Sequence, residues 1–162
     1  MSERNGGGGV VYLKGDATAP AADGVKIIAH ICNDIGGWGA GFVLAVSKKW
    51  KAPEQDYRQW HKSGDGFALG ELRLVPVSPD TFVANMIAQR GVKADNGIPP
   101  IRYEALRECL AKLAVQAAEL KAGVHMPRIG CGLAGGSWDM VEPLIRGTLV
   151  EKGIAVFVYD FG

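Results

Sequence analysis

The chain has 162 residues, 48% of them hydrophobic, and a formal net charge of +1 at pH 7. This length predicts one domain with its own core, and the near-zero charge excludes a long-range field that would gather nucleic acid or hold the chain on an acidic membrane. No apolar run approaches a bilayer span and no targeting segment is evident, so we expect a cytoplasmic protein that does not bind membranes.

Cysteine and histidine usage gives no sign of a metal centre. The cysteines, Cys32, Cys109 and Cys131, are odd in number and lack C-x-x-C spacing. This pattern favours free thiols in a reducing compartment over disulfides or zinc ligation. The histidines are equally scattered and no H-E-x-x-H occurs, so we expect no metal ion and no cofactor.

The N-terminal part of the chain alternates glycine with apolar runs. Residues 1–9 predict a flexible leader, and residues 10–162 a single domain. Apolar runs at 10–13 and 25–32 predict strands, and the second is so continuous that both its faces should be covered. This second strand leads into a glycine-rich loop at 33–41.

Two helices and two strands are predicted in the middle of the chain. Apolar residues at helical spacing predict a helix over 42–50, and a second helix over 53–62 begins with a proline in its first turn. Runs rich in β-forming residues at 72–77 and 81–87, separated by Ser-Pro-Asp, predict a hairpin. A polar loop then continues to Pro100.

The C-terminal part contains the most regular helical pattern. Apolar residues step by three and four between 102 and 121, and we expect Gly123 to close this helix at its C′ position. A strand at 124–129, a helix at 138–150 and a strand at 154–159 follow. This order of elements predicts an α/β fold with helices on both faces of a mixed sheet.

The loop between the strand at 124–129 and the next helix is typical of an anion site. Its glycines can turn through positive φ and present N–H groups to a ligand, and Ser137 suits the N-cap of the helix. The positive end of that helix should then face the same anion, so we expect phosphate binding. GCGLAG, with Asp160 beyond it, also matches the dinucleotide fingerprint. A Rossmann unit needs several more strands after this motif, and only one is predicted.

Four segments resemble the macrodomain family, whose members are small α/β/α modules that bind ADP-ribose. The segments are KGDAT (14–18), IAHICNDIGGWGAGFVLAVSKKW (28–50), PIRYEAL (100–106) and MPRIGCGLAGGSW (126–138). Their order and spacing are similar to those of the branch containing the terminal ADP-ribose protein glycohydrolase. The resemblance covers nearly the whole chain and implies a three-layer α/β/α fold with a mixed, roughly six-stranded sheet.

The resemblance also implies which residues hold the ligand. Asp16 would accept a hydrogen bond from the adenine amino group, although a solvated turn residue is the plainer interpretation. Asn33 would lie near the hydroxyls of the distal ribose, and Tyr159 would flank the adenine or form the edge of the core. The other implied ligand-binding residues are Ala17, His30, Gly37, Gly39, Gly41, Ile129, Gly130, Cys131, Gly132, Leu133, Ala134 and Gly135.

The sequence departs from this branch at two catalytic positions. The branch's lysine and aspartate correspond to Gln89 and Ala134 here, which excludes a covalent lysine route because glutamine forms no Schiff base. Catalysis would then depend on a held water, polarised by Asn33, by Asp34 or by the substrate's phosphate, or oriented by Gln89. Asp34 is the leading general-base candidate, and a loop-capping role explains it equally well. Cys131 is discounted as a nucleophile because no histidine lies near it in sequence.

We therefore expect an ADP-ribose-binding enzyme, an ADP-ribosyl hydrolase that releases ADP-ribose from glutamate or aspartate esters on modified proteins. A non-catalytic ADP-ribose reader is the main alternative, favoured by the two replaced residues. A phosphatase or deacetylase acting on ADP-ribose derivatives is a variant within the enzyme class. The expected partners are ADP-ribose and ADP-ribosylated protein, with nucleic acid only if it is itself ADP-ribosylated, and we expect a monomer.

Overall fold

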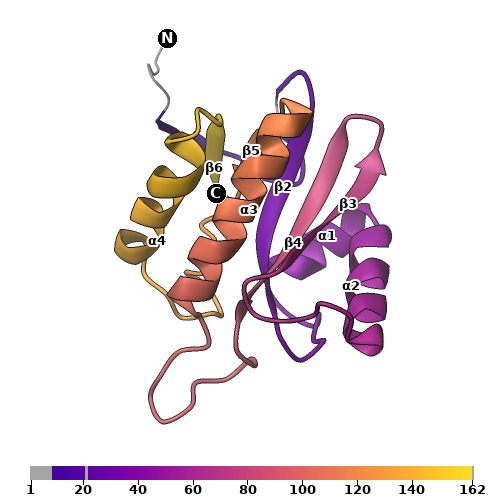
Figure 1. Ribbon diagram of the computed structural model, residues 1–162, viewed down its shortest axis with the longest axis vertical. Coiled ribbons are helices and arrows are strands. Elements are labelled where there is room, and N and C mark those ends of the chain that lie inside the picture. The colour runs from indigo at the N-terminus through magenta and orange to yellow at the C-terminus, as the bar shows by residue number, and fades with distance from the viewer. Residues whose placement is uncertain (1–8, 21, 162) are drawn as a thin grey trace.

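The computed structural model describes residues 9–20 and 22–161, so residues 1–8 of the expected leader lie outside the described residues. A six-stranded sheet of order β1-β6-β5-β2-β4-β3 lies between two layers of helices (Figure 1). The strands are β1 (Val10–Lys14), β2 (Lys26–Asn33), β3 (Leu72–Ser78), β4 (Thr81–Gln89), β5 (Gly123–Met126) and β6 (Val156–Asp160). Among these described strands only the β3–β4 pair is antiparallel, which confirms the mixed sheet and its hairpin.

Two helices cover each face of the sheet. The helices are α1 (Phe42–Lys49), α2 (Ala52–Ser63), α3 (Tyr103–Leu120) and α4 (Trp138–Ile145), and α4 continues as a π-helical turn (Arg146–Val150). The helices α3 and α4 pack on one face, and α1 and α2 on the other (Figure 1). The three-layer α/β/α architecture is therefore confirmed. In the part of the chain that the structure describes, no helix combines the length and apolar character needed to cross a bilayer.

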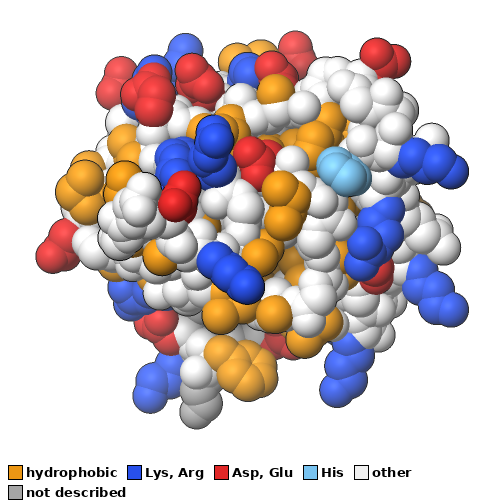
Figure 2. All heavy atoms as spheres, turned by 90° about the horizontal axis from the view of Figure 1, so that it is seen from below, with side chains coloured by type: hydrophobic (Ala, Val, Ile, Leu, Met, Phe, Trp, Pro, Cys, Tyr) orange, Lys and Arg blue, Asp and Glu red, His pale blue; other side chains and the backbone are white. Residues whose placement is uncertain are grey.

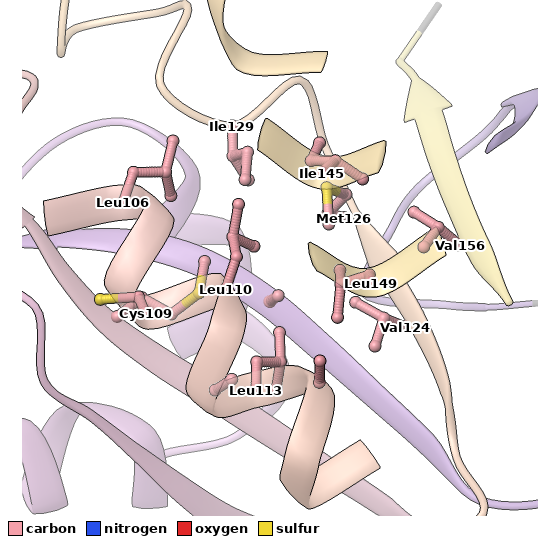
Figure 3. Close-up of a cluster of buried hydrophobic side chains, with 14 of the residues drawn as sticks. Leu106, Cys109, Leu110, Leu113, Val124, Met126, Ile129, Ile145, Leu149 and Val156 are labelled. Atoms are coloured by element: carbon pink, nitrogen blue, oxygen red, sulfur yellow. The ribbon is translucent and has the colours of Figure 1, made fainter. Parts of the chain in front are cut away.

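Each face of the sheet has its own hydrophobic core. The larger core lies under α3 and α4 and is filled by fully buried aliphatic side chains such as Leu110 and Leu149 (Figure 3). The smaller core lies under α1 and α2. Strand β2 contributes Ile27 to the first core and Ile28 to the second, both at 0% exposure. The continuous apolar pattern of this strand therefore predicted its position correctly.

The ends of three C-terminal elements differ from the prediction. Gly123 does not close α3, because Lys121 already takes the left-handed conformation at φ 54° and Gly123 begins β5. The strand predicted at 124–129 stops at Met126, since Pro127 has no N–H for a ladder. The final helix turns π-helical shortly after Pro143, whose missing N–H interrupts the α-helical pattern.

Candidate functional site

A continuous cleft runs along the edge of the sheet where the parallel strands end. Figure 2 looks onto this edge, where hydrophobic side chains line a hollow and lysine and arginine side chains surround it. The cleft consists of four adjoining cavities, of about 540, 390, 510 and 530 Å³, which we call the first to the fourth. Successive cavities share lining residues, namely Phe42, then Leu133, then Lys93. An elongated ligand can therefore occupy several cavities at once.

The first cavity brings together Asp16, Ala17 and Tyr159, as the resemblance implied. The Oδ1 atom of Asp16 accepts hydrogen bonds from the backbone N–H and the hydroxyl of Thr18, at 2.8 and 2.7 Å. Burial raises the pKa of Asp16, but the bonds from Thr18 and the nearby lysines outweigh it and hold this pKa below its usual value. An ionised acceptor is thus fixed beside the cavity.

The glycine-rich loop 129–136 supplies the second cavity with backbone donors. Four of its residues line this cavity and have N–H groups without an acceptor among the described residues: Gly130, Gly132, Leu133 and Ala134. Cys131 and Gly135 instead donate their N–H groups to carbonyls within the loop, and neither lines any of the four cavities. The loop therefore separates amides that hold its shape from amides available to an anion.

The helix that directs its positive end at the second cavity is α1, not α4 as the sequence suggested. Gly41 is the N-cap of α1 and lines the cavity with Phe42, and α1 has neither a side-chain cap nor an acid in its first turn. Ser137 does occupy the N-cap position of α4, but its side chain forms no cap hydrogen bond. Its N–H donates to the hydroxyl of Tyr103, at 3.1 Å, which turns this helix start toward α3.

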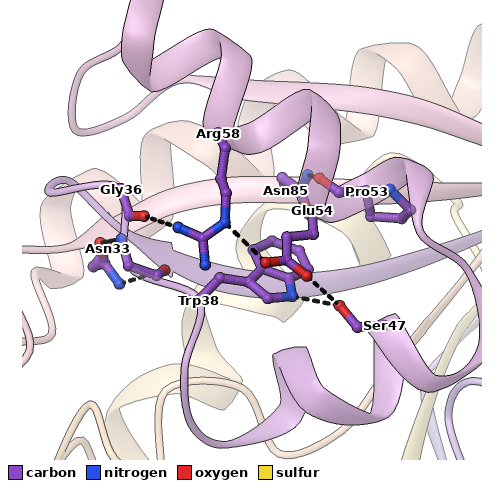
Figure 4. Close-up of polar contacts among 9 residues, drawn as sticks. Asn33, Gly36, Trp38, Ser47, Pro53, Glu54, Arg58 and Asn85 are labelled. Carbon is purple, nitrogen blue, oxygen red and sulfur yellow. Dashed lines mark hydrogen bonds and ion pairs between the residues drawn. The ribbon is translucent and has the colours of Figure 1, made fainter.

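The third cavity is lined by the loop 33–41, including Asn33, Gly37 and Gly39. The Oδ1 atom of Asn33 accepts the N–H groups of Ile35 and Gly37 at 3.0 and 2.9 Å, and its Nδ2 atom donates to the Gly37 carbonyl at 2.9 Å. The Tyr57 hydroxyl donates to the Asn33 carbonyl at 2.6 Å. The amide of Asn33 thus organises the loop from within (Figure 4).

Helix α2 fixes this loop from outside (Figure 4). The Arg58 guanidinium donates to the Gly36 carbonyl at 3.1 Å and to Glu54 at 2.8 Å. The Trp38 indole donates to the Ser47 hydroxyl at 2.6 Å, and that hydroxyl donates to Glu54 at 3.0 Å. The loop is therefore held by side chains of both α1 and α2.

Two of the three candidate catalytic residues, Asn33 and Gln89, share the third cavity, whereas Asp34 lines the fourth. Gln89 lines the second and third cavities, and its Nε2 atom donates to the Gly91 carbonyl at 2.9 Å. Asp34 lines the fourth cavity, where its Oδ1 atom accepts the Gly91 N–H at 2.8 Å. Asn33 lines the third cavity. Ala134 is buried beside the second cavity.

His30 lies buried beneath the second cavity and is neutral. Burial lowers its pKa to about 4, and the hydrogen bond with Asn85 opposes only part of this effect. The Asn85 amide donates to the Pro53 carbonyl at 3.1 Å, so its Oδ1 atom accepts from His30 Nε2 at 2.6 Å. His30 Nδ1 has no hydrogen-bond partner among the described residues. This side chain therefore offers an acceptor rather than a positive charge.

Arg128 is a cavity residue that the sequence analysis did not single out. It lines the second cavity, and its guanidinium donates to Asp160 at 2.7 and 2.9 Å. The same group lies 4.9 and 5.1 Å from the ring centroids of Tyr12 and Trp138. Asp160, the acid that completed the match to the dinucleotide fingerprint, is paired with this arginine instead. The only sequence signal for Arg128 is a basic residue just before the glycine-rich loop.

The described residues contain no group of three His, Cys, Asp or Glu side chains able to hold a metal ion. The Cys131 thiol donates to the Ile129 carbonyl at 3.5 Å, and burial raises the pKa of Cys131 above its ordinary value despite the opposing charge of Arg128. A raised pKa favours the unreactive thiol over the thiolate.

Two solved structures closely match the fold. A protein of unknown function from Bacteroides thetaiotaomicron is 58% identical, with a TM-score of 0.93 over 94% of this chain and 98% of that chain. A macrodomain protein from Streptomyces coelicolor is 54% identical, with a TM-score of 0.85 over 95% of this chain and 100% of that chain.

Curated relatives extend the comparison, whereas no family model matches the chain. The chromodomain-helicase-DNA-binding protein 1-like of Mus musculus is 33% identical over 93% of this chain, which spans only 17% of that protein. The ADP-ribose glycohydrolase OARD1 of Homo sapiens is 28% identical over 98% of this chain and 96% of that protein. Given its identity to the Streptomyces protein over the full length of that structure, the chain belongs to the macrodomain family.

Proposed function

We propose that the chain binds ADP-ribose along the cleft, with adenine in the first cavity, the diphosphate in the second and the distal ribose in the third. The observation that carries this proposal is the set of four available N–H groups in the second cavity, opposite the uncapped start of α1. A diphosphate is the ligand group that such converging donors suit best.

We further propose that the protein hydrolyses ADP-ribose esters of glutamate or aspartate side chains. The relative named ADP-ribose glycohydrolase supports a hydrolase, and the fourth cavity adjoins the candidate ribose site. A water held there by Asp34 or Gln89 would add to the acyl carbon of the ester. The bond from that carbon to the ribose oxygen would break, and the proton released by water would pass to that oxygen. Positioning and local donors would supply the catalysis.

The test is a comparison of linkages in one experiment. The protein is incubated with peptides that carry ADP-ribose on glutamate or on serine, and with ADP-ribosylated DNA, and released ADP-ribose is quantified. We expect release from the glutamate ester and little from the serine O-glycoside. Release from serine but not from glutamate would contradict ester hydrolysis.

A non-catalytic reader is the second candidate. It is favoured because neutral residues, Gln89 and Ala134, stand where the related branch has its catalytic lysine and aspartate. It is also favoured because the Asn33 amide already forms hydrogen bonds within its own loop. Tight binding of ADP-ribosylated peptide with no release over hours would support the reader and exclude the hydrolase.

A further inference from the structure

The fourth cavity lies beyond the proposed ribose site and differs from it in chemical character. It shares Ile35, Val92 and Lys93 with the third cavity, so the two are continuous. If ADP-ribose binds as proposed, the group attached to the distal ribose extends into the fourth cavity. The residues that line this cavity would then determine which modified proteins or peptides fit.

Basic residues outnumber acidic residues in this lining by three to two. The charged residues are Arg90, Lys93, Arg102, Asp34 and Asp95. The Arg102 guanidinium already donates to the carbonyls of Pro99, Pro100 and Ile101 at 2.6, 3.1 and 3.0 Å. Arg90 and Lys93 are exposed and form no ion pair or side-chain hydrogen bond with any described residue. Two positive charges are thus available for a ligand, in a lining that also carries the carboxylates of Asp34 and Asp95.

The remaining lining residues favour a peptide over a nucleic acid. Ile35, Val92 and Ala94 are aliphatic, and no aromatic ring lines the cavity. Single-stranded nucleic acids are usually bound by base stacking on aromatic side chains, for which this cavity has no platform. The net charge of +1 adds no broader field for a polyanion. The methylene groups of acidic side chains suit the aliphatic lining, and their carboxylates suit Arg90 and Lys93.

We propose that the fourth cavity selects acceptor peptides in which the modified residue is flanked by acidic residues, with Arg90 and Lys93 binding the flanking carboxylates. This inference rests on the proposed function, because it requires ADP-ribose in the first three cavities. It adds the class of acceptor, an acidic peptide segment.

The test uses two peptides that carry ADP-ribose through an amide in place of the ester, so that binding is measured without hydrolysis. One peptide has aspartate and glutamate beside the modified position, and the other has asparagine and glutamine. Calorimetry is performed with the wild type, with an Arg90→Gln/Lys93→Gln variant, and with Lys152→Gln as a matched control that removes an exposed lysine lining none of the four cavities.

We expect the wild type and Lys152→Gln to bind the acidic peptide about fivefold more tightly, as for two exposed ion pairs, and high salt to reduce this preference. The double variant should lose the preference between the two peptides. Because Lys93 also lines the third cavity, each peptide's affinity is compared with that of free ADP-ribose for the same variant. Equal binding of the two peptides by the wild type would overturn the inference. It would also be overturned if an ADP-ribosylated oligonucleotide bound more tightly than the acidic peptide through Arg90 and Lys93. Failure of free ADP-ribose to bind would instead contradict the proposed function itself.

Discussion

The two glycine-rich loops that frame the cleft are stabilised in different ways. The loop 33–41 is held by side chains, chiefly Asn33 within it and residues of α2 outside it. The loop 129–136 is closed by its own backbone, and three of its glycines, Gly130, Gly135 and Gly136, have no room for a side chain. A Cβ atom at Gly136 would lie 2.6 Å from the Gly130 carbonyl oxygen, and one at Gly130 would lie 2.5 Å from Ile101. The first loop should therefore be sensitive to loss of polar groups, and the second to added bulk.

Gly132 tests the second loop without disturbing its fold. A Cβ atom there meets nothing within 4 Å, and Gly132 is not among the glycines with positive φ. A leucine at this position would fill the second cavity, so we expect Gly132→Leu to weaken ADP-ribose binding about 100-fold, equivalent to ~2.7 kcal/mol, with an unchanged unfolding temperature. Calorimetry and thermal unfolding measure the two effects. Gly132→Ala is the matched control and should retain most of the affinity. If Gly132→Leu bound ADP-ribose with normal affinity, the diphosphate could not lie in the second cavity.

Asn33 tests the first loop. Removing its amide leaves the N–H groups of Ile35 and Gly37 and the Gly37 carbonyl without their partner. We expect Asn33→Ala to lower the free energy of unfolding by about 1–3 kcal/mol and to weaken ADP-ribose binding about tenfold. Asn33→Asp keeps the acceptor for both N–H groups and should be milder. If turnover fell while affinity and stability were unchanged, Asn33 would act on the reacting ribose rather than on the loop.

The sequence predicted the helices, the strands and the loops that line the cleft. It did not predict which helix start and which side chains direct hydrogen-bond donors into the cleft. Hydrophobic periodicity located β2 and α3, because these elements are buried in regular patterns. The motifs placed Asp16 and Gly130 in one cleft. The sequence could not show that α1, rather than α4, directs its N-terminus at the second cavity. A serine before a helix favours an N-cap whatever the fold, and only the fold brings the Tyr103 hydroxyl to the Ser137 N–H. The pairing of Arg128 with Asp160 likewise depends on tertiary contact.

A buried titratable residue, His30, packs against the loop 33–41 from strand β2. The loop 129–136 has no titratable residue of its own besides Cys131. The His30 ring packs edge-on against Trp38, with centroids 5.5 Å apart, and burial lowers the pKa of His30 to about 4. In the unfolded chain this pKa returns to about 6.5, so the unfolded state binds the proton first as the pH falls. Stability should be constant above about pH 7 and decline between about pH 6.5 and 4.

Urea unfolding at pH 7.5 and 5.5 measures this decline, and we expect His30 to contribute about 1 kcal/mol at pH 5.5. His125, whose pKa burial also lowers to about 4, should add to the same window. His61→Gln is the control, because His61 is exposed and the decline should persist in this variant. Equal stability at the two pH values would show that neither buried histidine stays neutral in the folded protein.

Substitution of Gln89 should have the smallest effect on activity. Gln89 lines both the second and the third cavity, and neither glycine-rich loop depends on it alone. Its Nε2 atom donates to the Gly91 carbonyl at 2.9 Å, and it lines the second and third cavities. If catalysis is positional, Gln89→Ala removes one group that orients water and should lower the rate of release from a glutamate ester about fivefold, with little change in ADP-ribose affinity. Asp34→Asn, which keeps an acceptor for the Gly91 N–H but removes the charge, should lower the rate more if Asp34 is the general base. An unchanged rate in both variants would leave substrate-assisted attack by the ligand's own phosphate as the route that fits the cleft.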